Sequence, residues 1–199
     1  MEQRIIFVRH GALPEEVAHA LVGNCEVPLS AQGRAEALAC GSYLAEQRVD
    51  VAYSGTLRRV VETRELAESR AANLPQAISD PRLNEMDFGE WNLLPASDFP
   101  FADWDFGDPA FGFPGGDTMA TFMERTRAAY ADILASGAQS IVIFSHGGVI
   151  MGLLADILGI SRSGQFNLWV ERGSIAEVSY KHGRSRLYRV FRPLDFLEK

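Results

Sequence analysis

Two histidines of this 199-residue chain end the same short pattern, in which four apolar residues and one polar residue precede His-Gly. The pattern spans residues 5–11 and again residues 141–147, and it includes two of the four histidines. A short β-branched run that ends at glycine predicts a buried strand of a parallel sheet. Because ligands bind at the carboxyl ends of such strands, His10 and His146 are predicted to meet in one crevice. A neutral imidazole there is an adequate nucleophile near pH 7.

Cations and a carboxyl group accompany these histidines. Arg9 directly precedes His10, so a fixed cation lies beside a candidate nucleophile, which suits an anionic substrate. Arg58 and Arg59 fall in the first turn of a predicted helix, where the helix dipole disfavours cations unless an anion is bound there. Glu85 lies in a loop between apolar residues, where partial desolvation would raise the carboxyl pKa and make it a candidate proton donor.

Each of these residues also has a less specific interpretation. The two histidines could be hydrogen-bonded core residues or metal ligands, although a neighbouring arginine repels a divalent cation and is not one of its usual ligands. Arg9 and Arg59 could be partners in structural ion pairs. Glu85 could cap local amides, which leaves Asp87 and Glu90 as alternative proton donors.

Other polar residues are interpreted more simply. Arg58 is expected to be the solvated or substrate-fringe member of its pair, and His182 to lie in a hairpin turn. His19 lies in the irregular stretch after the first strand and is a candidate to face a substrate. Cys25 and Cys40 are expected to be reduced thiols without an active role, because the chain has no Cys-x-x-Cys motif and no secretory signal.

The elements that must position these residues alternate as in an α/β chain. Ser30 is predicted to cap a helix over residues 31–47, and Thr118 a helix that ends near residue 135. A further helix is predicted after Thr56, with Leu57, Val61 and Leu66 facing inward. A helix is also predicted over residues 148–158. Strands are predicted over residues 51–53, 77–78, 166–170, 174–180 and 186–191. The order predicts one domain over residues 1–199, a three-layer sandwich with a mostly parallel sheet, helices on both faces and antiparallel C-terminal strands.

The composition limits the partners. Nineteen Lys and Arg residues against 26 Asp and Glu residues give a net charge of -7, which argues against nucleic acid or an anionic membrane as the main partner. The apolar run after Arg4 is too short for a signal peptide, and residues 149–158, interrupted by Asp156, are too few to span a bilayer. We therefore expect a cytoplasmic protein that acts on a small molecule, and a homodimer is left open.

Five short motifs occur in a fixed order along the chain. They are Arg9-His10-Gly11, Pro28-Leu29-Ser30 with Gly33, Leu57-x-Arg59 with Thr63, Leu83-x-Glu85 with Phe88-Gly89-x-Trp91, and Ser145-His146-Gly147-Gly148. Together they resemble the motifs of the histidine phosphatase superfamily, in its phosphoglycerate-mutase-like branch (branch 1). Their order is more specific than any one motif.

The resemblance implies a phosphoglycerate-mutase-like fold and a phosphoric monoester hydrolase that works through a phosphohistidine. It implies that His10 is phosphorylated and that Glu85 donates a proton to the leaving oxygen, then acts as base when water attacks. The phosphoryl group would be held by Arg9, Arg59, His146 and Gly147. Since two guanidiniums supply permanent charge to the phosphoryl oxygens, no metal and no other cofactor is expected.

The chain departs from the family pattern at three places. Leu13 stands where a threonine is usual, which removes a hydroxyl contact to the phosphate unless serine or backbone donors replace it. Asn92 stands where glutamate often follows Gly-x-Trp, and Gly116-Asp117-Thr118 stands for Gly-Glu-Ser.

Residues 83–124 contain no Lys or Arg but nine acidic and nine aromatic residues. An insertion at about residues 93–117 is predicted to be a lid, as in the family. A mutase would use basic residues there to hold a second anionic group, so this lid favours a phosphomonoester with an uncharged or apolar body. A cofactor-dependent phosphoglycerate mutase and a non-catalytic module that binds phosphate esters or phosphoproteins are the alternatives. The aromatic residues, which could instead pin a loop onto the core, include Phe99, Phe101, Trp104, Phe106, Phe111 and Phe113.

Overall fold

The computed structural model describes residues 2–99, 104–161, 164 and 167–197. Six strands form one sheet in the order β3-β2-β4-β1-β5-β6. The four parallel strands are β1 (Gln3–Arg9), β2 (Val51–Ser54), β3 (Ile78–Ser79) and β4 (Ser140–Ser145). The antiparallel strands are β5 (Ile175–Lys181) and β6 (Arg184–Phe191). The predicted mixture of parallel and C-terminal antiparallel strands is confirmed.

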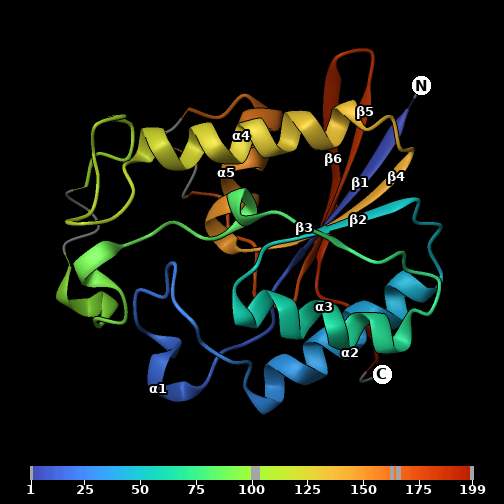
Figure 1. Cartoon of the computed structure of the whole chain (residues 1–199), viewed down its shortest axis with the longest axis horizontal. Helices are drawn as coiled ribbons and strands as arrows, with labels where there is room; N and C mark the ends of the chain where they lie inside the picture. Colours follow the sequence, from blue (N-terminus) through green and yellow to red (C-terminus); the bar gives the residue numbers. More distant parts are fainter. Residues whose placement is uncertain (1, 100–103, 162–163, 165–166, 198–199) are drawn as a thin grey trace.

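Helices cover both faces of this sheet (Figure 1). One face carries α2 (Ala31–Ala45) and α3 (Arg58–Arg70), and the other carries α4 (Met119–Ala135) and α5 (Gly147–Leu158). Because side chains alternate along a strand, Ile5 and Phe7 of β1 pack with α4 and α5, whereas Ile6 and Val8 pack with α2 and α3. The predicted three-layer sandwich is therefore confirmed. The short elements are α1 (Glu15–Ala18), α6 (Leu194–Leu197) and the 3-10 turns Pro81–Leu83, Gly89–Trp91 and Ala96–Asp98.

Both predicted helix caps are present. The Ser30 hydroxyl accepts the N–H of Gly33 at 3.0 Å, so α2 begins directly after it. Thr118 and Thr121 form a reciprocal capping box at the start of α4. These bonds satisfy donors that the first turn of a helix leaves unpaired, which fixes where each helix starts.

The prediction of which α3 residues face inward is wrong. Leu57 is buried but precedes the helix, while Val61 and Leu66 are only half-buried. The apolar pattern misplaced the face because polar side chains turn inward toward the carboxyl ends of the parallel strands. The buried residues of α3 are Arg59, Val60, Thr63 and Ala67.

The strand predicted over residues 166–170 is also wrong for its described part. Phe166 lies outside the described residues, and residues 167–170 form no strand. The segment instead returns over the end of β1, where the Val170 carbonyl accepts a bond from the Arg9 side chain and the Gly173 N–H donates to the His10 carbonyl at 2.9 Å. Residues 167–174, which we call the β5 approach loop, therefore lie beside the first histidine.

Candidate active site

The register of two central strands brings the two histidines together. Arg9 of β1 is paired with Ser145 of β4, and a histidine follows each of them. The ring centroids of His10 and His146 lie 5.3 Å apart, with the planes at 60°. His10 is 3% exposed and His146 is fully buried. The two imidazoles meet at the carboxyl edge of the sheet, as the repeated sequence pattern predicts.

The two rings differ in their hydrogen bonds. His10 Nδ1 lies 2.8 Å from the Gly11 carbonyl oxygen, so Nδ1 carries the proton and Nε2 carries the free lone pair. Neither nitrogen of His146 has a hydrogen-bond partner among the described residues. A buried polar atom without a partner is costly, so this ring is suited to a ligand that supplies one.

Both imidazoles are held neutral. Burial lowers the pKa of His10 well below its usual value, and the charges of Arg59 and Arg9 lower it further. The pKa of His146 is lowered in the same way, by burial first and then by Arg59. A neutral His10 at pH 7 has the lone pair that a nucleophile needs.

Arg9 lies against the first turn of α5. Its guanidinium donates to the Val170 carbonyl, its Cζ lies 5.5 Å from the centre of the Trp169 ring, and its Nε has no partner among the described residues. A Cβ at Gly147 would lie 2.7 Å from Arg9 Cζ, so glycine is required for this close approach. Burial lowers the pKa of Arg9 to about 10, which leaves it charged at pH 7.

Arg59 is fully buried at the start of α3. It does not line the cavity described below, and its Nε has no partner among the described residues. Its neighbour Arg58 is exposed and pairs with Glu62 at 2.7 Å, as expected for the solvated member of the pair. The Arg59 guanidinium donates over 2.8–3.3 Å to the carbonyl oxygens of Val22, Gly23 and Cys25.

Glu85 faces the histidines from the loop after β3. One carboxylate oxygen accepts the N–H of Gly148 at 3.0 Å and the other accepts the N–H of Met86 at 3.1 Å. The Ser145 hydroxyl donates to the Leu83 carbonyl at 2.7 Å and ties this loop to the end of β4. The carboxyl group is 8% exposed and lines the cavity.

The alternative acids are placed elsewhere. Asp87 accepts the N–H of Gly89 at 2.9 Å and the amide of Asn92 at 2.7 Å, so its carboxylate organises the following turn. Neither Asp87 nor Glu90 lines the cavity, which leaves Glu85 as the carboxyl group that does.

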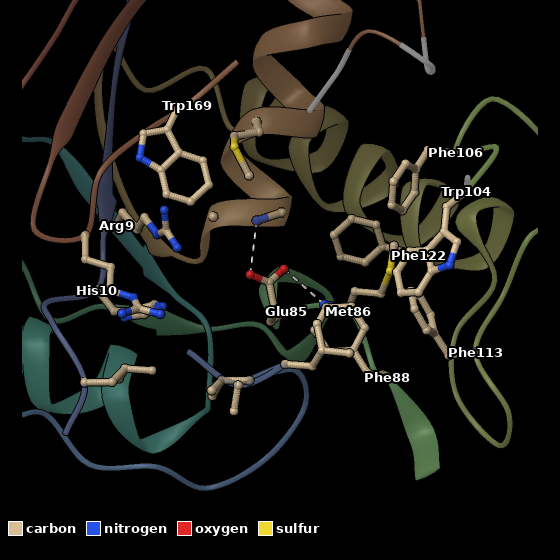
Figure 2. A pocket seen from close by; sticks show the side chains of 18 residues that line it. Arg9, His10, Glu85, Met86, Phe88, Trp104, Phe106, Phe113, Phe122 and Trp169 are labelled. Carbon is tan, nitrogen blue, oxygen red and sulfur yellow. Dashed lines mark hydrogen bonds between the residues drawn. The ribbon is translucent and has the colours of Figure 1, made fainter. Parts of the chain in front are cut away.

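A cavity of about 540 Å³ opens in front of these groups. Figure 2 shows Arg9, His10 and Trp169 at one end of it, Glu85 between the ends, and a group of aromatic rings at the other end. The cavity therefore has a charged end and an aromatic end. The aromatic lining consists of Phe88, Trp104, Phe106, Phe113 and Phe122.

The aromatic end is built largely from the predicted lid segment. The Trp104 ring contacts the rings of Phe106, Phe111 and Phe113, with centroids 5.4–5.7 Å apart. Phe99 contacts Trp104 at 5.9 Å, whereas Phe101 lies outside the described residues. The rings both line the cavity and pack on one another.

Several cavity residues were not anticipated from the sequence. Trp169 and Arg172 lie in the β5 approach loop; Trp169 was assigned to a strand, and Arg172 fell between two predicted strands. Met151 of α5 also lines the cavity. In the sequence it could not be distinguished from the other apolar residues of that helix. His19, in contrast, is exposed at the end of α1 and does not line the cavity.

Two other expectations, on the cysteines and on His182, concern side chains away from the cavity. Cys25 and Cys40 are free thiols. His182 lies between β5 and β6 with a φ of 52°, as expected for a hairpin turn. Within the described part of the chain, no group of three or more His, Cys, Asp or Glu residues could hold a metal ion, and no helix is long and apolar enough to cross a membrane.

Comparisons with known proteins agree with this geometry. A family model described as histidine phosphatase superfamily (branch 1) matches residues 5–192. The adenosylcobalamin/alpha-ribazole phosphatase of Salmonella typhimurium is 28% identical, over 92% of this chain and 94% of that protein. The glucosyl-3-phosphoglycerate phosphatase of Mycobacterium tuberculosis is 28% identical, over 78% of this chain and 75% of that protein. The crystal structure of the alpha-ribazole phosphatase from Shigella flexneri superposes with a TM-score of 0.81 at 26% identity and covers 96% of each chain.

Proposed function

The chain belongs to the histidine phosphatase superfamily, branch 1, and on that premise we propose that it hydrolyses a phosphomonoester through a phosphohistidine at His10. The observation that carries this proposal is the pair of neutral imidazoles, 5.3 Å apart, at the charged end of a cavity. We take residues 1–199 as one domain with residues 93–117 as its lid, supported by the single sheet and by the lid aromatics that line the cavity.

In the first step, His10 Nε2 attacks phosphorus. The N–P bond forms as the bond from phosphorus to the alcohol oxygen breaks, and the Gly11 carbonyl stabilises the positive charge that develops at Nδ1–H. Glu85, in its protonated form, gives its proton to the leaving oxygen. Its bonds to the N–H groups of Gly148 and Met86 hold the carboxyl group in place for this transfer.

The phosphoryl charge is balanced by groups around the two histidines. Arg9 and Arg59 supply permanent positive charge, and each has an Nε without a partner among the described residues. His146 supplies a ring nitrogen that likewise has none. The backbone of Gly147, at the N-terminus of the twelve-residue helix α5, adds the positive end of the helix dipole.

In the second step, water attacks the phosphohistidine. Glu85, now ionised, takes a proton from the water, the P–N bond breaks, and His10 leaves as the neutral imidazole. Inorganic phosphate and the starting form of the site result. Because the two arginines provide the charge, the scheme uses no metal ion.

The two ends of the cavity indicate the substrate class. The arginines that line it, Arg9 and Arg172, both lie at the phosphate end, whereas the lid supplies aromatic rings. A small phosphorylated metabolite with an uncharged or apolar body fits this distribution. A phosphoglycerate mutase would need further cations to hold a second anionic group, and the described lining residues include none at the lid end.

Release of inorganic phosphate from p-nitrophenyl phosphate tests the function. We expect turnover by the wild type and a loss in kcat of more than about 10³-fold in His10→Ala. His182→Asn is the matched control, because His182 lies in the β5–β6 turn. Labelling from a ³²P substrate should be acid-labile in the wild type and missing in His10→Ala. Faster conversion of 3- to 2-phosphoglycerate than phosphate release would instead identify a mutase, and tight binding without turnover would identify a binding module.

A further inference from the structure

Arg172 is a charged residue of the cavity that the proposed reaction leaves without a role. It precedes Gly173, whose N–H donates to the His10 carbonyl at 2.9 Å. Gly173 has a φ of 70°, and a Cβ there would lie 2.6 Å from the Cβ of Glu36. Only glycine fits this conformation and this space, so the backbone next to Arg172 is fixed beside the proposed nucleophile.

The Arg172 side chain reaches from this loop to the segment that follows β1. One of its N–H groups donates to the Ala18 carbonyl at the end of α1, at 3.2 Å. The side chain is half-buried and lines the same cavity as Arg9 and His10. A guanidinium has five N–H donors, so the bond to Ala18 leaves others for a ligand.

Among the described residues, the part of the cavity lining that lies between His10 and α2 offers no side-chain donor. The residues of this apolar wall are Leu13, Ala20, Leu21 and Val22. An anion seated between the two histidines therefore meets hydrocarbon on this side unless Arg172 contacts it.

The charge of Arg172 acts directly on the phosphate end of the cavity. After burial, it contributes to the lowered pKa of Arg9, more strongly than Arg59 does, and it also lowers the pKa of His10. Burial lowers the pKa of Arg172 itself, while Glu36 and Glu171 oppose that change. The guanidiniums of Arg9 and Arg172, which line the cavity, and of Arg59 behind it repel one another, and a bound anion relieves that repulsion.

We propose that Arg172 is a third guanidinium ligand of the phosphoryl group and binds a non-bridging oxygen on the side of the apolar wall. The proposal rests on the proposed function for the identity of the anion. The β5 approach loop would then help to hold the phosphate. None of the five sequence motifs lies in this loop.

Binding of inorganic phosphate tests the role of Arg172 without requiring turnover. We expect Arg172→Gln to weaken phosphate binding, measured by isothermal titration calorimetry, by about tenfold or more, and Arg172→Lys to weaken it less because the charge remains. Arg48→Gln is the matched control: Arg48 pairs with Asp50 at 3.1 Å and lies outside the cavity, so phosphate affinity should not change.

A second measurement separates a ligand from a structural tie to Ala18. Without phosphate, Arg172→Gln should melt within a few degrees of the wild type, whereas the rise in Tm caused by phosphate should shrink. Added guanidinium ion should partly restore phosphate binding to Arg172→Ala. Unchanged phosphate affinity in Arg172→Gln overturns the proposal, and so does a weakened affinity that accompanies a large fall in the phosphate-free Tm and is not restored by guanidinium.

The outcomes distinguish this inference from the proposed function. Wild-type turnover of p-nitrophenyl phosphate together with unchanged phosphate affinity in Arg172→Gln refutes the role of Arg172 alone. Phosphate binding that depends on Arg172 in a wild type without turnover supports the ligand and refutes the phosphatase.

Discussion

The N–H of Gly148 donates to a carboxylate oxygen of Glu85 at 3.0 Å, and this bond joins the first turn of α5 to the loop after β3 (Figure 2). The contact is so close that a Cβ at position 148 would lie 2.3 Å from Glu85 Oε1. The proposed proton donor is thus positioned by the helix that begins at the second histidine.

Gly148→Ala should displace Glu85 and lower kcat by about 10²-fold, because general acid catalysis depends on the placement of the acid. Gly152→Ala on the same helix is the control, since its new methyl group would meet the flexible end of Met123. Steady-state kinetics with p-nitrophenyl phosphate measure both variants, and circular dichroism checks that both fold. Equal activities would show that Glu85 is not held by this contact.

The lowered pKa of His10 predicts the pH dependence. An imidazole is the nucleophile only when neutral, and a lowered pKa keeps it neutral well below pH 6.5. We therefore expect kcat/KM for p-nitrophenyl phosphate, whose phenolate leaves without a proton from Glu85, to stay flat from about pH 7.5 to 5.5 once it is corrected for the dianionic fraction of the substrate. With its ordinary pKa of about 6.5, the neutral fraction of an imidazole would fall about tenfold from pH 7.5 to 5.5, so kcat/KM would fall by the same factor. An acid limb centred near pH 6.5 would contradict the assignment.

Treatment with EDTA should leave kcat unchanged, because in the proposed reaction Arg9 and Arg59 supply the charge that a metal supplies in other phosphatases. The assay is run on protein dialysed against the chelator, with and without added magnesium or zinc. Strong inhibition by EDTA that zinc reverses would assign the phosphoryl charge to a metal instead.

The acidic lid should disfavour substrates with a second negative charge. Asp105 is exposed and accepts the N–H of Gly107, whereas Asp103 lies outside the described residues. Asp105→Arg should raise kcat/KM for a bisphosphorylated substrate relative to p-nitrophenyl phosphate by a few-fold, and salt should reduce the gain. Glu46→Arg, at the end of α2 and away from the cavity, serves as the control. An unchanged ratio would refute electrostatic selection by the lid.

Much of the charged end could be predicted because it depends on local pattern. A strand followed by His-Gly fixes where each imidazole leaves the sheet, and the parallel register then brings His10 and His146 together. The caps at Ser30 and Thr118 were likewise predictable, since a capping side chain acts within a few residues.

The remaining features depend on contacts between distant segments. The carbonyl partners of Arg59 come from a loop more than thirty positions earlier, so no apolar period reveals that this arginine is buried. The first part of the β5 approach loop has the composition of a strand, but the hydrogen bonds of this loop go to His10 and Arg9. Arg172 fell in the predicted connection between two strands, and no motif links that connection to the histidines.

The rings around Trp104 come mainly from one continuous stretch of chain, whereas the groups at the phosphate end come from strand ends and from α5. Substitutions in that stretch would change which alcohol portion of the substrate fits the cavity, while the residues proposed to break the phosphate ester bond stay unchanged. Because the aromatic end comes mainly from one segment, grafting a different segment there is a direct route to redesign of the proposed selectivity.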